Sequence, residues 1–231
     1  MDKQLDSALV WFRRDLRTDD HAALYHALKS ARRVWCVFVF DTAILDTLPR
    51  ADRRVEFIHD SVLALDQRLQ ALAPQARLIV RHGHAITELP QLAEQLHVQA
   101  VYANHDDEPE ALARDARVRG SLANAGVSFH TSKDHVVFER SELLTGSGKP
   151  YSVFTPYKNA WLKKVDAFYL SAYPVAKYAA SLAPLPDDID ATVPSPGACR
   201  TWNVESENRP QRGQFLPDLQ AHSPAMGQKD G

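Results

Sequence analysis

Residues 8–17 form the segment that decides the fold, Ala8-Leu9-Val10-Trp11-Phe12-Arg13-Arg14-Asp15-Leu16-Arg17. Its first half is a continuous apolar run, which is typical of a strand covered on both faces, as in a parallel sheet. Its second half is charged, and such residues suit the polar edge of a parallel sheet, where ligands usually bind. The segment therefore predicts a first, central strand with polar side chains at its carboxyl end.

Further apolar runs alternate with helical periodicities up to about residue 130. The runs that predict strands cover residues 34–40, 76–80, 100–103 and 127–130. Apolar residues three or four positions apart predict helices over residues 51–73, from Ile86 to Leu96, and over residues 108–125. Pro90 is expected in the first turn of the second helix or at its start, because proline lacks the N–H that a helix interior needs. This alternation indicates an α/β fold, a doubly wound, Rossmann-like parallel sheet.

The pattern changes after about residue 131. A turn-rich stretch leads to Thr155-Pro156, which we interpret as the N-cap and the first-turn proline of a new helix. Trp161, Val165 and Phe168 would share one face of this helix, and that apolar face would need a partner. We read it as the first helix of an incomplete all-α domain.

Three regions follow from this pattern. Residues 1–131 are predicted to form the α/β domain, and residues 132–193 a linker with the start of a helical domain. Residues 194–231 show no sustained period and are rich in Gly, Pro, Gln, Asn and Ser, so we expect an irregular tail.

Composition excludes several classes of protein. The 231 residues are 45% apolar and 24% charged, as in globular proteins, and no run approaches the roughly 18 apolar residues that cross a bilayer. No secretory signal opens the chain, and its only cysteines, Cys36 and Cys199, suit a reduced compartment, so we expect a cytoplasmic protein. The net charge of −2 gives no overall basic surface for nucleic acid. The ten histidines show no metal-ligand spacing.

Four blocks of sequence, in this order and spacing, resemble the photolyase/cryptochrome family. They are FRRDLRTDDHAAL at 12–24, VFDTAIL at 39–45, YANHDDEPEALARD at 102–115 and GSGKPYSVFTPYKNAWL at 146–162. The resemblance covers residues 7–170. It implies an N-terminal α/β domain that binds an antenna chromophore, a deazaflavin or a folate such as methenyltetrahydrofolate, and a C-terminal helical domain that binds FAD.

The activity implied by the resemblance is light-dependent repair of cyclobutane pyrimidine dimers in damaged DNA, with the difficult chemistry carried by the flavin. Family members are roughly twice as long as this chain. We therefore expect the chain to carry the antenna domain, to lack most of the FAD domain and its pocket, and to be inactive alone as a monomer. Whether it is an enzyme is left open.

The resemblance also implies site residues. Asp41, Arg54, Asp106 and Glu108 match positions that contact the antenna chromophore. Carboxylates suit that role because the edge of a pterin or deazaflavin ring offers N–H donors. The alternative is structural: Asp106 and Glu108 would be a charged helix N-terminus, and Arg54 a solvated helix cation.

Two other groups of charged residues have both a functional and a structural interpretation. Arg13, Arg14 and Arg17 either line the antenna pocket or, as we favour, include an arginine that pairs with Asp15 and fixes the loop. Lys149 and Lys158 lie in the region that borders the DNA-binding face of the family, and could contact phosphates. A solvated helix face is the alternative for both lysines.

Two alternative functions stay open. A signalling cryptochrome shares the same N-terminal half, so these blocks do not separate it from a repair enzyme. A stand-alone chromophore- or nucleotide-binding α/β module is the third interpretation. The lack of a G-x-G-x-x-G motif and of a P-loop argues against ordinary dinucleotide or nucleoside triphosphate binding.

Overall fold

The structure, a computed structural model, describes residues 3–49 and 52–194. Its centre is a five-stranded, fully parallel sheet with the strand order β3-β2-β1-β4-β5. The strands are β1 (Leu5–Phe12), β2 (Ala31–Asp41), β3 (Leu78–Gly83), β4 (Ala100–Asn104) and β5 (Ser128–Ser132). This order is that of a doubly wound sheet and confirms the predicted fold class. The first strand, β1, lies in the middle, as expected of its apolar run.

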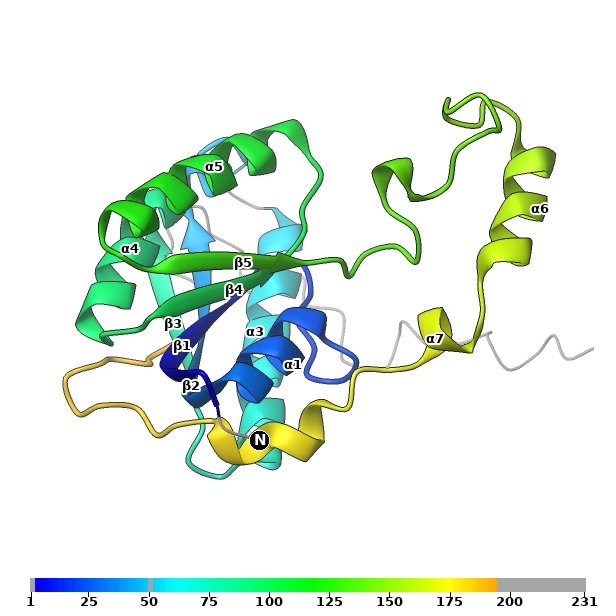
Figure 1. Ribbon diagram of the computed structural model, residues 1–231. Coiled ribbons are helices and arrows are strands. Elements are labelled where there is room, and N and C mark those ends of the chain that lie inside the picture. The colour runs from blue at the N-terminus through cyan, green and yellow to red at the C-terminus, as the bar shows by residue number, and fades with distance from the viewer. Residues whose placement is uncertain (1–2, 50–51, 195–231) are drawn as a thin grey trace, which may run out of the picture.

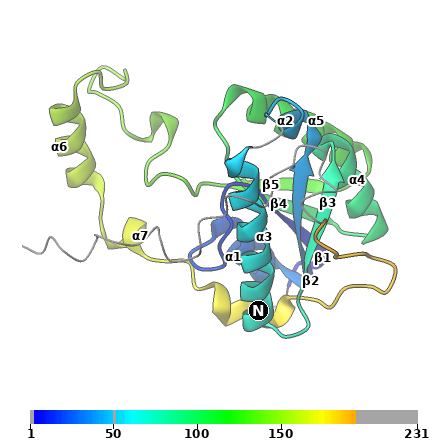
Figure 2. The same ribbon diagram turned by 180° about the vertical axis from the view of Figure 1, so that it is seen from behind.

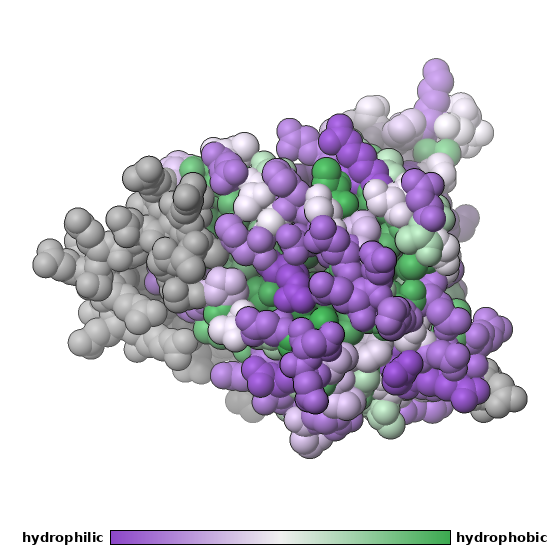
Figure 3. Space-filling model, turned by 90° about the vertical axis from the view of Figure 1, so that its left-hand side faces the viewer, coloured by the Kyte–Doolittle hydropathy of each residue, from purple (hydrophilic) through white to green (hydrophobic). Residues whose placement is uncertain are grey.

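Alternate residues of β1 point to opposite faces and divide the core in two. Ala8, Val10 and Phe12 pack with the first helical layer, which consists of α1 (Ala22–Ser30) and α3 (Arg53–Leu72). Leu9 and Trp11 pack with the second layer, α4 (Ala85–Gln95) and α5 (Pro109–Asn124). Figures 1 and 2 show these two layers on either side of the sheet. The outer surface over α4 and α5 is mainly hydrophilic, with only small, separate apolar areas (Figure 3).

Two helical features differ from the sequence prediction. The sequence analysis did not identify α1, which begins after His21, whose side chain caps it by accepting the N–H of Leu24. Pro90 was expected in the first turn of α4 or at its start, but it lies inside the helix. It removes one backbone hydrogen bond there. Leu89 and Leu92 on either side of it are at most 1% exposed, so burial of this face holds the helix together despite that loss.

Residues 139–173, which we call the arm, leave the sheet after β5 and extend away from it (Figure 1). They contain the short η1 (Arg140–Glu142), α6 (Phe154–Lys164) and α7 (Ala167–Leu170). The prediction of Thr155 as the N-cap of a single helix is wrong, because the N-cap is Val153. The helix also ends at Lys164, before Val165, and Phe168 belongs to α7.

The three predicted apolar residues of the arm therefore do not share one helix face. Trp161 packs edge-on against Phe138, with 5.8 Å between the ring centroids, whereas Phe168 is 80% exposed. None of the side chains of α6 or α7 is buried.

Residues 175–189, which we call the clasp, return from the arm to the α/β domain. The clasp begins with η2 (Val175–Ser181), which packs against α1, and it contributes Leu182, 2% exposed, to the core. The N–H of Ala183 donates to the carbonyl of Val34 at 3.0 Å, and the indole N–H of Trp35 donates to the carbonyl of Pro184 at 2.9 Å. The predicted linker 132–193 thus includes a segment that completes the core. The predicted irregular tail lies, from residue 195 on, outside the described residues.

No helix in the described part of the chain is long and apolar enough to cross a bilayer. The predicted end of the α/β domain at residue 131 stays a prediction. Residues of the clasp, which lie well beyond 131 in the chain, also belong to the two core clusters around the sheet.

We predict that Leu182→Ala destabilises the α/β domain by about 2–4 kcal/mol, because it leaves a cavity beneath β2 and removes buried apolar surface. Leu170→Ala, in the arm and 68% exposed, is the matched control and is expected to change the free energy of unfolding by less than about 0.5 kcal/mol. Urea denaturation of the full chain, followed by circular dichroism, measures both. Equal effects of the two substitutions would show that the clasp is not part of the cooperative unit.

Candidate functional site

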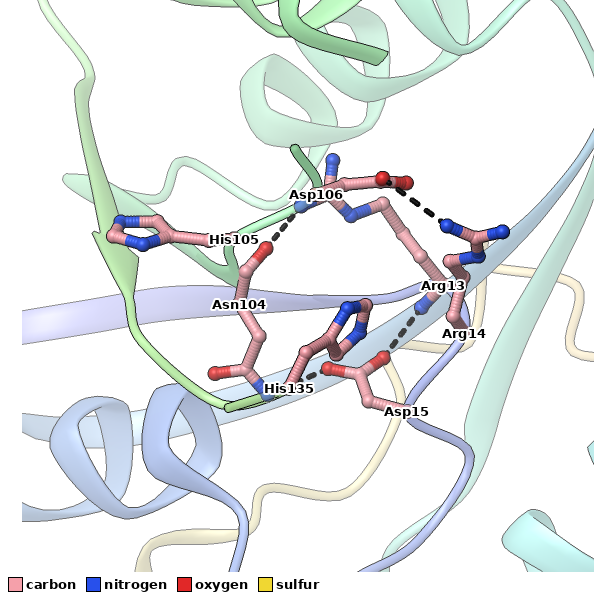
Figure 4. Close-up of a pocket in the computed structure, with 7 residues that line it drawn as sticks. All are labelled: Arg13, Arg14, Asp15, Asn104, His105, Asp106 and His135. Carbon is pink, nitrogen blue, oxygen red and sulfur yellow. Dashed lines mark hydrogen bonds and ion pairs between the residues drawn. The ribbon is translucent and has the colours of Figure 1, made fainter. Parts of the chain in front are cut away.

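The polar residues at the carboxyl ends of β1 and β4 surround a small depression (Figure 4). The chain crosses from one side of the sheet to the other between these two strands, which is the topological switch point where ligands of such sheets bind. The depression has about 150 Å³ of open space. It is lined by Arg13, Arg14, Asp15, Asn104, His105, Asp106 and His135.

Asp15 is the centre of a buried hydrogen-bond network beneath the depression. Its carboxylate, in a residue only 5% exposed, accepts the backbone N–H of Arg13 at 2.9 Å and the side-chain amide of Asn104 at 2.6 Å. Nε2 of His21 lies 2.9 Å from the same carboxylate. Asn104 in turn accepts the N–H of Ala23 at 2.9 Å. The network joins the end of β1, the end of β4 and the start of α1.

The protonation of this network follows from its contacts. Nδ1 of His21 accepts the N–H of Leu24, so the ring proton lies on Nε2 and is donated to Asp15. Burial would raise the pKa of Asp15, but the hydrogen bond from His21, together with the one from the backbone N–H of Arg13, outweighs it. The net effect is a pKa of Asp15 well below its usual range. The sequence analysis favoured an arginine side chain as the partner of Asp15. That is wrong, since the partners are His21, Asn104 and a backbone N–H.

Arg13 is fixed in place and has a structural role. Its guanidinium pairs with both oxygens of Asp115 on α5 at 2.7 Å and also donates to the carbonyl of Asn104. It lies over the ring of Trp11, 4.5 Å from the centroid, and its side chain is 8% exposed. A guanidinium that is buried, paired with a carboxylate and stacked on a ring is held in one position.

Asp106 and Glu108 lie together at the rim of the depression, where α5 begins. The carboxylate of Asp106, 9% exposed, is 3.4 Å from one guanidinium nitrogen of Arg14 and 3.9 Å from Arg114. Glu108, the N-cap residue of α5, has a 64% exposed side chain that pairs with Arg14 at 2.8 Å. Of the four predicted antenna residues, these two lie next to each other and pair with the same arginine, and Asp106 also lines the depression.

Asp41 and Arg54 lie elsewhere. Asp41 ends β2, on the other side of β1 from β4, and its carboxylate caps α2 (Thr42–Leu45) by accepting the N–H of Ala43 at 3.1 Å. Arg54 is exposed at the start of α3, where it pairs with Asp52 at 2.5 Å. The structure therefore does not bring Asp41 or Arg54 into contact with Asp106 and Glu108.

Lys149 and Lys158 are both on the exposed arm. The backbone of Lys149 closes a turn through hydrogen bonds with the side-chain hydroxyl of Thr145, and Lys158 lies on α6. Within the described residues, neither ammonium group has a hydrogen-bond or ion-pair partner, in contrast to Lys164, which donates to the carbonyl of Glu142.

The sequence analysis missed several residues that build the site. His21 and Asn104 hold Asp15, and Asp115 holds Arg13, yet none of them belongs to an apolar period. His105 points away from Arg14 and Asp106 (Figure 4) and binds Glu139 at 2.8 Å, which ties the first residue of the arm to the domain. The only available signal was that His21, Asn104 and Asp115 all fall inside the quoted sequence blocks.

A family model described as DNA photolyase matches residues 8–179. The match contains both strands of the switch point, the polar residues at their ends and the whole arm. The chain belongs to the DNA photolyase family.

The chain is also similar to individual photolyases and to a cryptochrome. A deoxyribodipyrimidine photo-lyase of Synechococcus is 35% identical over 153 residues, which are 66% of this chain and 31% of that protein. A Sulfolobus tokodaii photolyase, described as holding two FAD molecules and implying a novel light-harvesting cofactor, is 30% identical with a TM-score of 0.58. That match covers 69% of this chain and 35% of the archaeal one. A Synechocystis cryptochrome, 25% identical, has a TM-score of 0.69 over 88% of this chain and 41% of its own.

The matched region therefore spans about a third of the Synechococcus photo-lyase. The family match itself extends from β1 through the arm.

We predict that Asp15→Asn lowers stability at pH 7 by about 1–3 kcal/mol, because a charge-assisted network loses its acceptor. The folded pKa of Asp15 lies below its unfolded value of about 3.9. Its contribution is therefore complete above about pH 4 and is lost as the pH falls through the lowered pKa. Asp15→Asn should show a smaller loss of stability between about pH 5 and 2 than the natural chain.

Thermal unfolding over this pH range measures the difference. Asp19→Asn, at an exposed position in the same loop, is the control and should follow the natural chain. A pH profile of Asp15→Asn parallel to that of the natural chain would contradict the assignment of this charge to Asp15.

Proposed function

We propose that the described α/β domain binds a heteroaromatic antenna chromophore, a deazaflavin or a folate, at the switch point of its sheet. The observation that carries the proposal is the pair of carboxylates, Asp106 and Glu108, side by side at the rim of the depression. Carboxylates accept the N–H groups that the edge of such a ring presents. The depression is shallow and open to solvent, so it would take only the edge of the ring system, not the whole molecule.

The other two predicted antenna residues lie farther from the depression. Asp41 and Arg54 lie beyond the depression, and Asp41 is engaged as a helix cap. They would contact the part of the ligand that reaches past β1 toward the end of β2. Because the Sulfolobus tokodaii photolyase is described with two FAD molecules and a novel light-harvesting cofactor, FAD belongs among the ligands to be tested.

We further propose light-dependent repair of cyclobutane pyrimidine dimers as the activity of a protein in which this domain is joined to a flavin-binding domain. The family match and the photo-lyase relative support this proposal. FAD would supply the electron that opens the dimer, and the role of the described residues would be to hold the antenna near it. The chain alone would be inactive in repair, and we propose a cytoplasmic monomer.

A blue-light signalling role is the second candidate. The likeness to the Synechocystis cryptochrome favours it as much as the photolyase likenesses favour repair, because all of them rest on the same α/β domain. Antenna binding is compatible with both candidates, and DNA-dimer repair by the joined protein would decide between them.

The arm supplies the proposed contacts to damaged DNA. Lys149 and Lys158 are exposed and near the aromatic side chains of Tyr151 and Tyr157, which pack edge-on at 6.1 Å. Contacts from such lysines to phosphates would position DNA without reading its sequence.

We predict that the purified chain binds 5,10-methenyltetrahydrofolate or 8-hydroxy-5-deazariboflavin, detected by a fluorescence titration, and that Glu108→Gln weakens this binding about tenfold. The physical reason is the loss of a hydrogen bond to a charged group, which contributes about 1.5–3 kcal/mol. Glu110→Gln, an exposed substitution in the first turn of the same helix, is the control. No binding of either chromophore or of FAD would refute the antenna proposal and favour an empty module.

We predict that the double substitution Lys149→Gln and Lys158→Gln weakens binding of the chain to duplex DNA containing a thymine dimer. Each lost phosphate contact reduces the slope of log K against log salt by about 0.9, so the pair should reduce it by about 1.8. Fluorescence anisotropy at several salt concentrations measures the slope. Lys177→Gln, exposed on the clasp, should leave it unchanged, and an unchanged slope in the double variant would exclude these two contacts.

A further inference from the structure

Arg13 and Arg14 are adjacent in sequence but are held in opposite ways. Arg13 is buried, doubly paired with Asp115 and stacked on Trp11. Arg14 has a 51% exposed side chain and no ring contact within the described structure, and its guanidinium bridges the two carboxylates of Asp106 and Glu108. Figure 4 shows it reaching from the end of β1 across to Asp106. Of the two arginines, Arg14 is the one that can move without disturbing the core.

The carboxylate of Asp106 still has a cation and a hydrogen-bond donor nearby if Arg14 moves away. A buried carboxylate without a partner would be costly. Arg114, with a 15% exposed side chain, lies 3.9 Å from its other oxygen, and the N–H of Glu108 lies 3.4 Å from the oxygen that Arg14 contacts. Removal of Arg14 therefore does not leave the buried charge of Asp106 unpaired.

Breaking the ion pair between Arg14 and Glu108 also costs little free energy. Both side chains are more than half exposed, and ion pairs between such groups contribute little to stability. The hydrogen bond to Glu108 raises the pKa of Arg14 above its ordinary value. The guanidinium thus stays charged at any pH near neutrality, and salt, not pH, is what weakens its hold on the carboxylates.

We propose that Arg14 sets the affinity of this site by competing with the ligand for the carboxylates of Asp106 and Glu108. The inference rests on the proposed function, since it requires that these carboxylates receive the N–H donors of a chromophore. Arg14 takes up acceptor positions and negative charge of both carboxylates, so a ring N–H that donates to them has to share them with the guanidinium or displace it. The domain therefore binds its ligand more weakly than the two carboxylates would without Arg14.

The test is a fluorescence titration of the full chain and of Arg14→Gln with 5,10-methenyltetrahydrofolate, and in parallel with 8-hydroxy-5-deazariboflavin, at low and high salt. An exposed ion pair contributes up to about 1 kcal/mol, so Arg14→Gln should bind roughly three- to fivefold more tightly at low salt. This advantage should shrink at high salt, where screening already weakens the hold of Arg14 in the natural chain. The comparison of two proteins with the same ligand removes only the part of the salt effect that does not involve residue 14.

Arg140→Gln is the matched control. Arg140 is 59% exposed and pairs at 2.8 Å with Asp107, which is adjacent in sequence to both Asp106 and Glu108. Its removal changes the net charge by the same amount without freeing either proposed ligand carboxylate, so its affinity should equal that of the natural chain. Equal thermal unfolding of the three proteins establishes that the fold is intact.

The outcomes separate the two proposals. Tighter binding by Arg14→Gln alone supports the competition, including the case in which the natural chain binds too weakly to measure. Equal or weaker binding by Arg14→Gln, with measurable binding by the natural chain, overturns the competition and leaves antenna binding standing. The same gain in Arg140→Gln also overturns it, because the effect would then be one of net charge. No binding by any of the three proteins overturns both proposals.

Discussion

The buried carboxylate of Asp15 is the constraint on which the rest of the site depends. It receives hydrogen bonds from the backbone of Arg13, from Asn104 and from His21, which belong to the ends of β1 and β4 and to the cap of α1. The most distant of these donors, Asn104, is 89 residues from Asp15 in the chain. Without the carboxylate, several buried donors would lose their acceptor together, and each loss costs about 1–3 kcal/mol. One short side chain thus sets the geometry of the switch point.

This fixed base explains why two neighbouring arginines have different roles. The turn held by Asp15 directs Arg13 inward, onto Trp11 and Asp115, and leaves Arg14 at the rim beside Asp106 and Glu108. The rim is consequently a mixed-charge surface on a rigid floor. Such an arrangement holds the two carboxylates in place and pairs them with a cation, which limits the cost of keeping like charges close together.

The sequence predicts those features that are encoded in local patterns. The apolar run 8–12 and the helical period of Val55, Val62 and Leu69 correctly predicted the sheet and α3, because burial imposes its own spacing on the chain. The sequence analysis overlooked α1, a helix of nine residues whose cap is a histidine with a second role in the network. At the site, sequence blocks led to Asp106 and Glu108, but the partners of Asp15 are set by contacts across the sheet. No spacing rule contains such contacts.

The clasp, like the partners of Asp15, is held by contacts between residues far apart in the chain. The clasp joins the core through the carbonyl of Val34 and the indole of Trp35, the latter 149 residues from its partner in the chain, so no local period could have indicated it. Because β5 and the clasp both belong to the α/β domain, the arm is an excursion between two fixed points, not a free end. Neither α6 nor α7 contributes a buried side chain to the core. Local opening of the arm therefore requires little loss of apolar contact, and it can occur while the sheet, the clasp and the network around Asp15 stay folded.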